Sequence, residues 1–195
     1  MHVFVYASGD RGGPELSPIN ATAVKNFIAK FHIKKYLEGK VGSSPQGMMY
    51  TILRPVTFFE NLTPDIHGRG FVRMWEQIGD KKLQLVSTRD IGWFGANAFL
   101  HHEEYKNIAV TLVGDELSQT EADVIFKEVT GTNMAMAPCL IGKAVKWVKR
   151  DTVGDMFEWF EKEGYGGSVT ECRKIHPQMM DWRTWLKECS GFVRE

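Results

Sequence analysis

Residues 50–59 read Tyr-Thr-Ile-Leu-Arg-Pro-Val-Thr-Phe-Phe, a run rich in β-branched and aromatic residues that predicts a buried β-strand over residues 48–59. Pro55 should mark the end of this strand, because proline cannot donate to a central ladder of hydrogen bonds. A second apolar run, residues 2–7, stops at the glycine-rich segment 8–13 and predicts another buried strand that feeds a loop. Buried runs of this kind are typical of parallel sheets.

The segment between these two runs predicts a helix. Asn20 or Thr22 can accept hydrogen bonds from its first backbone N–H groups. Apolar residues then recur at helical spacing as far as Leu37, namely Val24, Phe27, Ile28, Phe31 and Ile33. Because a strand, a helix and a second strand follow one another, the N-terminal part predicts an α/β unit.

Short strands and helices are expected after residue 62. Residues 83–86 and 108–113 predict strands, and Asp90 is expected to be the N-cap of the helix that follows the first of them. Ser118-Gln-Thr-Glu121 is a capping box at the start of a helix that Gly131 ends. Three further stretches carry helical stripes: residues 143–149, 152–163 and 182–188. The whole pattern predicts an α/β fold with a helical C-terminal lobe.

The composition limits the class of function. A chain of 195 residues, 43% of them hydrophobic, suits one domain with a sizeable core. Lys plus Arg number 24 and Asp plus Glu number 24, so no basic excess favours nucleic acid as a direct partner. No apolar run approaches the roughly 18 residues needed to cross a membrane, and no signal peptide is visible. We therefore expect a cytoplasmic protein, with the nucleus as a second compartment.

Neither the cysteines nor the histidines form a metal-binding motif. The three cysteines (Cys139, Cys172 and Cys189) are odd in number and widely spaced, which fits no disulfide framework or zinc spacing. We expect them to be free and buried, in a reducing compartment. The histidines and glutamates of residues 101–104 are adjacent, unlike the i, i+4 pair of a zinc-binding helix. That segment is expected to be a surface loop, and no metal site is predicted.

Several stretches, in order along the chain, resemble the NmrA-like proteins, atypical members of the short-chain dehydrogenase/reductase superfamily, especially the fungal ones. Residues 51–61 are the most specific of them. The others are residues 4–8 with 10–13, 27–33, 85–92, 114–117 and 126–131. The resemblance implies a partial Rossmann-type parallel sheet, a C-terminal lobe that binds a substrate or partner, and an NADP(H) site. Members of this family are described as redox-sensing or regulatory proteins, while some relatives reduce small molecules.

The resemblance also implies which residues contact the cofactor. Lys30 occupies the position of the family's lysine, which contacts the nucleotide ribose; a solvated lysine on a helix surface is the alternative. Ser8 matches the strand-end serine, although a serine beside glycine is also a common turn former. Four more residues lie where the family chain passes the nicotinamide: Phe58, Phe59, Glu60 and Asn61. The two aromatic residues among them could equally belong to the core.

Two departures from the family pattern bear on catalysis. The glycine fingerprint that holds the pyrophosphate is not found, and Gly9-x-x-Gly12-Gly13 sits where the family has a later loop. Active members of the superfamily use a Tyr-x-x-x-Lys pair, in which the lysine lowers the pKa of the tyrosine. Asn26 stands four residues before Lys30, so no catalytic residue is assigned.

We therefore expect a single, N-terminally truncated NmrA-like domain over residues 1–195. Residues 1–62 are expected to be the remnant of the Rossmann sheet, which lacks roughly its first four strands. Residues 63–195 are expected to form a mixed lobe. The loss of strands should leave residues 2–7 as an open, apolar edge, so self-association, a protein partner or marginal stability is expected.

The expected role is that of a regulatory or redox-sensing NADP(H)-binding protein that acts through a protein partner and is not catalytic as it stands. The alternative is an NADPH-dependent oxidoreductase of a small molecule, completed by an N-terminal half from a longer chain or another subunit. A vestigial fragment, or a sequence whose true start lies upstream, are the remaining interpretations.

Overall fold

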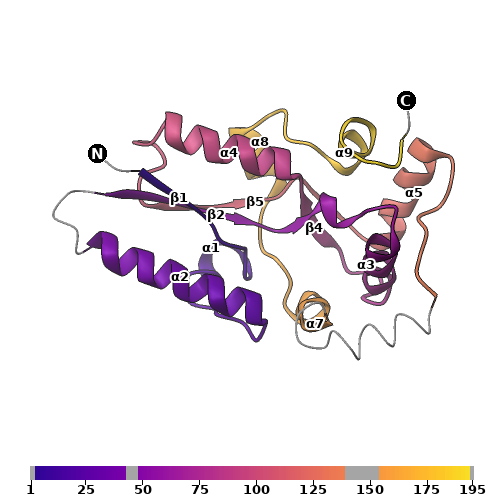
Figure 1. The fold of residues 1–195 in the computed structure, drawn as a ribbon, viewed down its shortest axis with the longest axis horizontal. Helices are drawn as coiled ribbons and strands as arrows, with labels where there is room; N and C mark the ends of the chain where they lie inside the picture. The colour runs from indigo at the N-terminus through magenta and orange to yellow at the C-terminus, as the bar shows by residue number, and fades with distance from the viewer. Residues whose placement is uncertain (1–2, 43–47, 139–153, 194–195) are drawn as a thin grey trace.

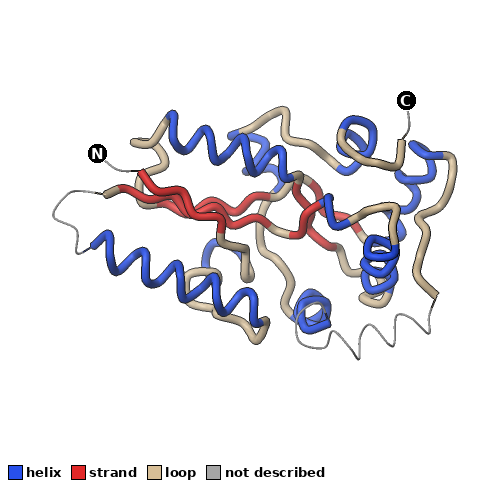
Figure 2. Tube along the Cα trace, viewed as in Figure 1, coloured by secondary structure: helices blue, strands red, loops and turns tan. Residues whose placement is uncertain are grey.

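The computed structural model describes residues 3–42, 48–138 and 154–193. Two three-stranded sheets follow one another along the molecule, with helices on both faces of the first (Figures 1 and 2). The first sheet has the order β1-β2-β5 and is parallel throughout. Its strands are β1 (Val3–Ala7), β2 (Met49–Pro55) and β5 (Ile108–Leu112). The predicted α/β fold with a partial parallel sheet is confirmed.

Two helices cover the two faces of this sheet. Helix α2 (Lys25–Gly42) lies on one face and α4 (Thr88–Leu100) on the other (Figure 1). Before α2, Asn20 accepts from the backbone N–H of Thr22, and the Thr22 hydroxyl accepts from the N–H of Val24. Both residues predicted as caps therefore help to start the helix. Strand β5 belongs to the part of the chain expected to form the mixed lobe, residues 63–195, but it pairs with β2. The first sheet therefore contains strands from both expected parts of the domain.

The second sheet corrects the expectation of one strand over residues 48–59. Its strands are β3 (Thr57–Phe58), β4 (Leu83–Val86) and β6 (Asp115–Leu117), with β3 parallel and β6 antiparallel to β4. Pro55 ends β2 as predicted, because it has no N–H for the ladder. The chain then passes Val56 and enters the second sheet as β3, before a 3-10 turn, η1 (Phe59–Asn61).

The helix caps were predicted in part. The capping box of Ser118 and Glu121 is present at the start of α5 (Gln119–Thr130), and Gly131 follows it at φ 80°. The predicted N-cap of α4 was wrong: Ser87 caps the helix by accepting from Arg89 N–H. Asp90 lies inside the helix, where its carboxylate accepts from Met180 N–H and faces His176 at 3.4 Å.

The C-terminal lobe is largely helical, as expected. Helix α9 (Trp182–Glu188) matches its predicted bounds, and α7 (Asp155–Lys162) lies inside the predicted stretch 152–163. The helix predicted at residues 143–149 lies outside the described residues. Three helices were not predicted: α1 (Gly13–Leu16), α3 (Ile66–Glu76) and α8 (Val169–Ile175). Two glycines in α3, Gly68 and Gly70, weaken its helical pattern.

Aromatic residues of this lobe form much of the largest hydrophobic cluster among the described residues. Trp75 and Trp182 are fully buried, and the Trp182 indole donates to Ala122 O at 3.0 Å. Of the two cysteines described, Cys172 is buried as expected, whereas Cys189 is exposed. The latter expectation was wrong because Cys189 follows the last turn of α9, at its solvent end. Residues 101–104 form the predicted surface segment.

A buried carboxylate connects three segments that lie far apart in the sequence. Asp10, in the loop after β1, is fully buried. It accepts hydrogen bonds from the backbone N–H groups of Gly12 and Gly13, from the Ser17 hydroxyl, from Thr111 in β5, and from the N–H of Gly166. The loop at residues 8–13, the first sheet and the segment after α7 are therefore held together at one point.

The backbones approach so closely there that glycine is required. A Cβ on Gly166 would lie 2.7 Å from the carbonyl carbon of Gly12, and a Cβ on Gly13 would lie 2.6 Å from Gly166 O. Both distances are shorter than real Cβ contacts, and Gly13 also has φ of 86°. Side chains at these positions would push the two loops apart.

Replacement of Asp10 by alanine should lower the free energy of unfolding by about 3 kcal/mol, because buried donors would lose their acceptor. Urea denaturation followed by circular dichroism measures this change. The matched control is Asp80→Ala, at an exposed aspartate, which should change the free energy by less than about 0.5 kcal/mol. Equal effects of the two substitutions would contradict the role given to Asp10.

Two glycine-to-alanine substitutions should have opposite effects. Gly166→Ala should destabilise the fold by about 2 kcal/mol through the clash with Gly12. Gly70→Ala, inside α3 where a Cβ would meet no atom within 4 Å, should stabilise it by about 0.5 kcal/mol. Thermal unfolding of both variants tests the pair, and a neutral Gly166→Ala would refute the close approach.

Candidate functional site

The candidate site lies where β1 and β2 end, which is where open parallel sheets bind ligands. Ser8 follows β1 and is fully buried, and its backbone N–H donates to Leu53 O at 2.8 Å. Two residues further on, the backbone N–H of Asp10 donates to Pro55 O at 3.1 Å. These bonds extend the pairing of β1 with β2 beyond the last residue of β1 and fix the start of the loop.

Lys30 reaches this strand end from α2. Its ammonium donates to Ser8 O at 2.7 Å and to Ala7 O at 3.4 Å. A lysine carries three N–H donors, so one remains without an acceptor among the described residues. Burial, and secondarily the charge of Arg11, lowers the pKa of Lys30. The sequence-predicted pair of Ser8 and Lys30 is thus brought into direct contact, with one donor left for a ligand oxygen.

Arg11 is a structural residue of the site that the sequence reasoning did not identify. Its guanidinium is fully buried and donates to three carbonyl oxygens of the loop, those of Gly9, Ser17 and Asn20, at 2.8–2.9 Å. It also donates to the Ser8 hydroxyl at 3.3 Å. The Ser8 hydroxyl therefore faces into the loop toward Arg11.

Arg54 adds a second buried guanidinium beside this loop. Only 4% of Arg54 is exposed, and its Nε has no hydrogen-bond partner in the described part of the chain. Burial lowers the pKa of Arg54, while the charges of Asp10 and Glu38 raise it. Lys34, also buried, pairs with Glu38 at 3.1 Å. Cations therefore outnumber anions between α2 and the first sheet. An arginine inside the apolar run 50–59 was the sequence signal for this charge.

The glycine loop itself cannot serve as a phosphate cradle. In a phosphate-binding loop, free backbone N–H groups point at the anion. Here the N–H groups of Gly12 and Gly13 already donate to the Asp10 carboxylate at 2.9–3.2 Å. An internal anion thus occupies the position that a ligand's phosphate would need.

The remaining sequence candidates lie in the second sheet and the turn after it. Phe58 is half-buried in β3, and Asn61 is exposed. Phe59 is fully buried, and its ring centroid lies 5.6 Å from that of Trp182 and 5.5 Å from that of Trp185. Phe59 is therefore a core residue, which was the alternative interpretation of its sequence position. The Glu60 carboxylate accepts from the N–H and the hydroxyl of Thr88, and so supports the start of α4. Phe59 and Glu60 are therefore held by contacts within the chain.

Two tyrosines beside the loop at residues 8–13, Tyr6 and Tyr165, have raised pKa values. Asn26 is exposed on α2, one turn before Lys30. The Tyr6 hydroxyl donates to Lys30 O at 3.3 Å, and burial raises its pKa. The Tyr165 hydroxyl shares a hydrogen bond with Thr57, and burial raises its pKa as well. A raised pKa makes both phenols weaker acids than a solvent-exposed tyrosine.

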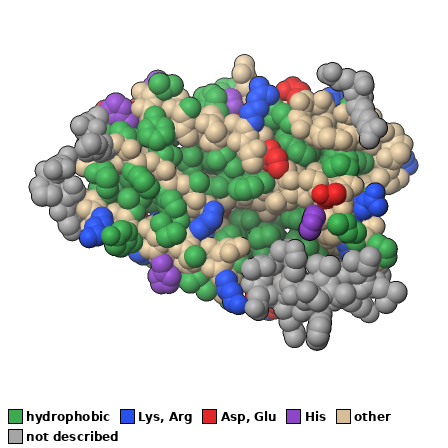
Figure 3. Space-filling view, viewed as in Figure 1, with side chains coloured by type: hydrophobic (Ala, Val, Ile, Leu, Met, Phe, Trp, Pro, Cys, Tyr) green, Lys and Arg blue, Asp and Glu red, His purple; other side chains and the backbone are tan. Residues whose placement is uncertain are grey.

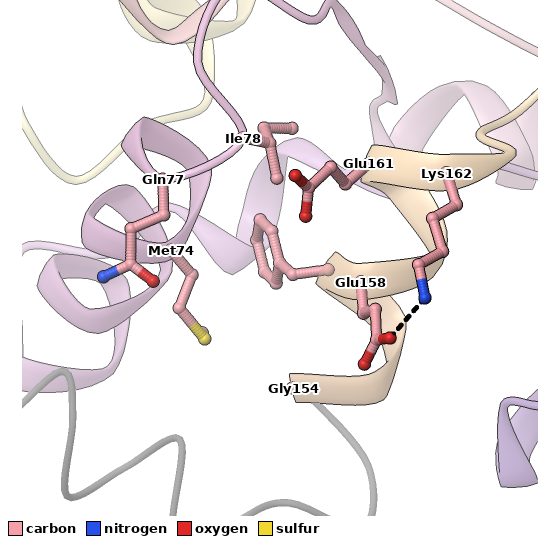
Figure 4. Close-up of a pocket in the computed structure, with 8 residues that line it drawn as sticks. Met74, Gln77, Ile78, Gly154, Glu158, Glu161 and Lys162 are labelled. Atoms are coloured by element: carbon pink, nitrogen blue, oxygen red, sulfur yellow. Dashed lines mark hydrogen bonds and ion pairs between the residues drawn. The ribbon is translucent and has the colours of Figure 1, made fainter.

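Two cavities lie away from the strand end. One of about 190 Å³ lies between α3 and α7, with an ion pair between Glu158 and Lys162 at its rim (Figure 4). Another, of about 350 Å³, lies beside α4 and is lined by Asp90, Trp93 and His176 among others. Within residues 3–42, 48–138 and 154–193, no group of three or more His, Cys, Asp or Glu side chains could hold a metal ion. None of the described helices is both long and apolar enough to cross a membrane.

Solved structures of similar fold span more than this chain does. A nucleoside-diphosphate-sugar epimerase from Staphylococcus aureus is 15% identical with a TM-score of 0.61, over 95% of this chain and 64% of that protein. NmrA, a negative transcriptional regulator solved in complex with NADP, is 13% identical with a TM-score of 0.59, over 97% and 64%. Gre2 from Candida albicans, in complex with NADPH, is 11% identical with a TM-score of 0.55, over 94% and 62%. The chain thus spans less than two thirds of the length of these proteins.

The comparisons agree with the geometry of the fold. At these identities the solved structures establish the Rossmann-type fold alone. None of the curated proteins compared with this sequence matches it. The model of the NmrA-like family matches residues 4–187, nearly the whole chain. This chain therefore belongs to the NmrA-like family.

Proposed function

We propose that this chain binds NADP(H) at the carboxyl ends of β1 and β2 and acts as a regulatory or redox-sensing protein without catalysis of its own. The observation that carries the proposal is the Lys30 ammonium, which Ser8 O and Ala7 O hold at the strand end with one N–H left over. Two proteins of similar fold, NmrA and Gre2, were solved with NADP and NADPH.

The residues of the strand end fit the ribose part of such a nucleotide. The remaining Lys30 donor suits a ribose hydroxyl, and the excess of buried cations beside it favours an anionic ligand. When bound, the nicotinamide would supply hydride chemistry. The chain itself would contribute binding and orientation, since Asn26 stands where a proton-transferring tyrosine would be needed.

The phosphate groups need a separate binding surface. The N–H groups of Gly12 and Gly13 are used by Asp10, so this loop does not hold a pyrophosphate. Strand β1 pairs with β2 alone among the described strands, which leaves its other edge free to accept a further strand (Figure 1). We propose that a protein partner or a second copy completes the site, in the cytoplasm. If the completing polypeptide also brings a catalytic acid, the assembly would be an NADPH-dependent oxidoreductase of a small molecule.

Titration of the 195-residue chain with NADPH, followed by cofactor fluorescence and by calorimetry, tests the proposal. Lys30→Met should weaken binding about tenfold, because it removes the charged donor. The matched control is Lys35→Met on the same helix, an exposed lysine, which should leave the affinity within about twofold. Circular dichroism shows whether each variant is folded. Equal affinities of the two variants would refute the proposed site, and absence of binding at millimolar NADPH would refute nucleotide binding by this chain on its own.

The affinity should also depend on pH in a defined direction. Because burial lowers the pKa of Lys30, this ammonium loses its proton at a lower pH than an exposed lysine does. NADPH affinity of the wild-type chain should therefore fall as the pH rises through the alkaline range. A Lys30→Arg variant should keep its affinity there, since arginine stays charged. Identical profiles for the two proteins would show that Lys30 does not contact the nucleotide.

A further inference from the structure

The cavity of about 350 Å³ beside α4 has the size of a ligand pocket. Three parts of the chain line it: α4, the segment between α8 and α9, and α9 itself. These helices lie on one side of the two sheets, whereas α2, which carries Lys30, lies on the other (Figure 1). Figure 3 shows basic, acidic and histidine side chains on the upper edge of the molecule, where α4, α8 and α9 lie in Figure 1. The cavity is therefore separate from the proposed nucleotide site.

A buried pair of titratable groups forms part of the cavity wall. Asp90 in α4 and His176 after α8 are both buried, and Asp90 Oδ1 lies 3.4 Å from His176 Nε2. The other oxygen of Asp90 accepts from the backbone N–H of Met180 at 3.0 Å. Burial raises the pKa of Asp90, while the Met180 hydrogen bond and the charge of His176 lower it. Both oxygens of Asp90 thus have partners within the chain. A carboxyl group perturbed by burial and by a charge partner, in a cavity wall, is typical of a functional site.

The imidazole of His176 is fixed in orientation and keeps one nitrogen for a ligand. Its ring stacks on the indole of Trp93, with centroids 4.0 Å apart and planes 6° apart. Nε2 faces Asp90, whereas Nδ1 has no hydrogen-bond partner in the part of the chain that the structure describes. Nδ1 is accessible to solvent, and the side chain lines the cavity. When the ring is protonated, Nδ1 is therefore an N–H donor at the cavity wall.

Arg89 is a second basic group in the lining, and its partner within the chain is a weak one. Its side chain is 68% exposed and makes one contact with Glu188 of α9, at 3.4 Å. A favourable arginine–carboxylate pair has two parallel N–H···O bonds at shorter distances. Exposed pairs such as this one contribute little to stability, so Arg89 can exchange Glu188 for a better acceptor. Glu188 thus holds the place that the carboxylate of a ligand would take.

Another part of the lining is apolar. Trp93 is 37% exposed, and the buried Met180 lines the same cavity. An indole and a thioether suit the flat apolar body of a small molecule. Basic groups and apolar surface therefore border one space, which matches an anion with an apolar body better than a free inorganic anion.

We propose that this cavity binds a small organic carboxylate. Its carboxylate contacts Arg89 and His176 and displaces Glu188, and its apolar body lies against Trp93 and Met180. Asp90 does not touch the ligand and holds the imidazole in position. This binding does not depend on the nucleotide site at Lys30.

Titration of the 195-residue chain with benzoate at about pH 6, where histidine side chains gain their charge, is the first experiment. Nuclear magnetic resonance signals of the His176 ring and the Trp93 indole should shift and saturate. Benzamide, which has the same shape without the charge, should bind at least about tenfold more weakly. Inorganic phosphate, which lacks the apolar body, should do the same. Equal binding of benzoate and benzamide, or no saturable shift at His176 and Trp93 with millimolar benzoate, would overturn the proposal.

Substitutions in the lining test the role of each charge. Arg89→Gln should weaken benzoate binding about tenfold. Glu188→Gln should strengthen it about threefold, because Arg89 loses its competing partner. The matched control is Arg183→Gln, at another exposed arginine that pairs with a glutamate but lies outside the lining, which should change the affinity by less than about twofold. Arg89 is exposed, so its variant should fold, and circular dichroism checks this. Equal affinities of the Arg89 and Arg183 variants, or weaker binding in Glu188→Gln, would refute recognition of an anion.

Discussion

The carboxylate of Asp10 is the constraint on which the rest of the structure depends. A buried anion must be matched by donors, and this one draws them from its own loop, from β5 and from Gly166, which lies 156 residues away in the sequence. Only glycine fits where the two loops cross. The bond to Gly166 ties the C-terminal lobe to the first sheet. The hydrogen bonds that Asp10 accepts within its own loop also fix the segment between β1 and α1, where Ser8 O faces the Lys30 ammonium.

The same carboxylate limits what the site can do. Because Asp10 takes the N–H groups of Gly12 and Gly13, the glycine loop serves the fold and not a phosphate. In the proposed site, ligand recognition would therefore rest on cations from α2, with Lys30 foremost. Burial raises the pKa of Tyr6 and of Tyr165, which makes both phenols weaker acids, and it lowers the pKa of Lys30. The proposed function, nucleotide binding without catalysis by this chain, rests on the Lys30 donor and on Asn26 in the place of a tyrosine.

Local signals in the sequence predicted the elements that depend on neighbouring residues. The capping box at Ser118, the end of β2 at Pro55 and the bounds of α9 needed no distant contacts. Long-range contacts decided the rest. Asp90 has the chemistry of a cap, but Met180 and His176 hold it inside α4. In the same way, Ser8 and Lys30 followed from the family resemblance, whereas Arg11 and Arg54 did not. Arg54 is visible in the sequence only as a charge inside the apolar run 50–59, and the burial of both arginines beside Asp10 depends on long-range contacts.

Nuclear magnetic resonance mapping of the chain titrated with NADPH reports every backbone amide separately and so locates the nucleotide. Saturable shifts are expected at Ser8, Gly9 and Lys30, with the amides of Gly12 and Gly13 little changed, since Asp10 keeps their hydrogen bonds. Shifts centred on Gly12 and Gly13, or on the cavity between α3 and α7, would contradict this expectation and place the ligand elsewhere.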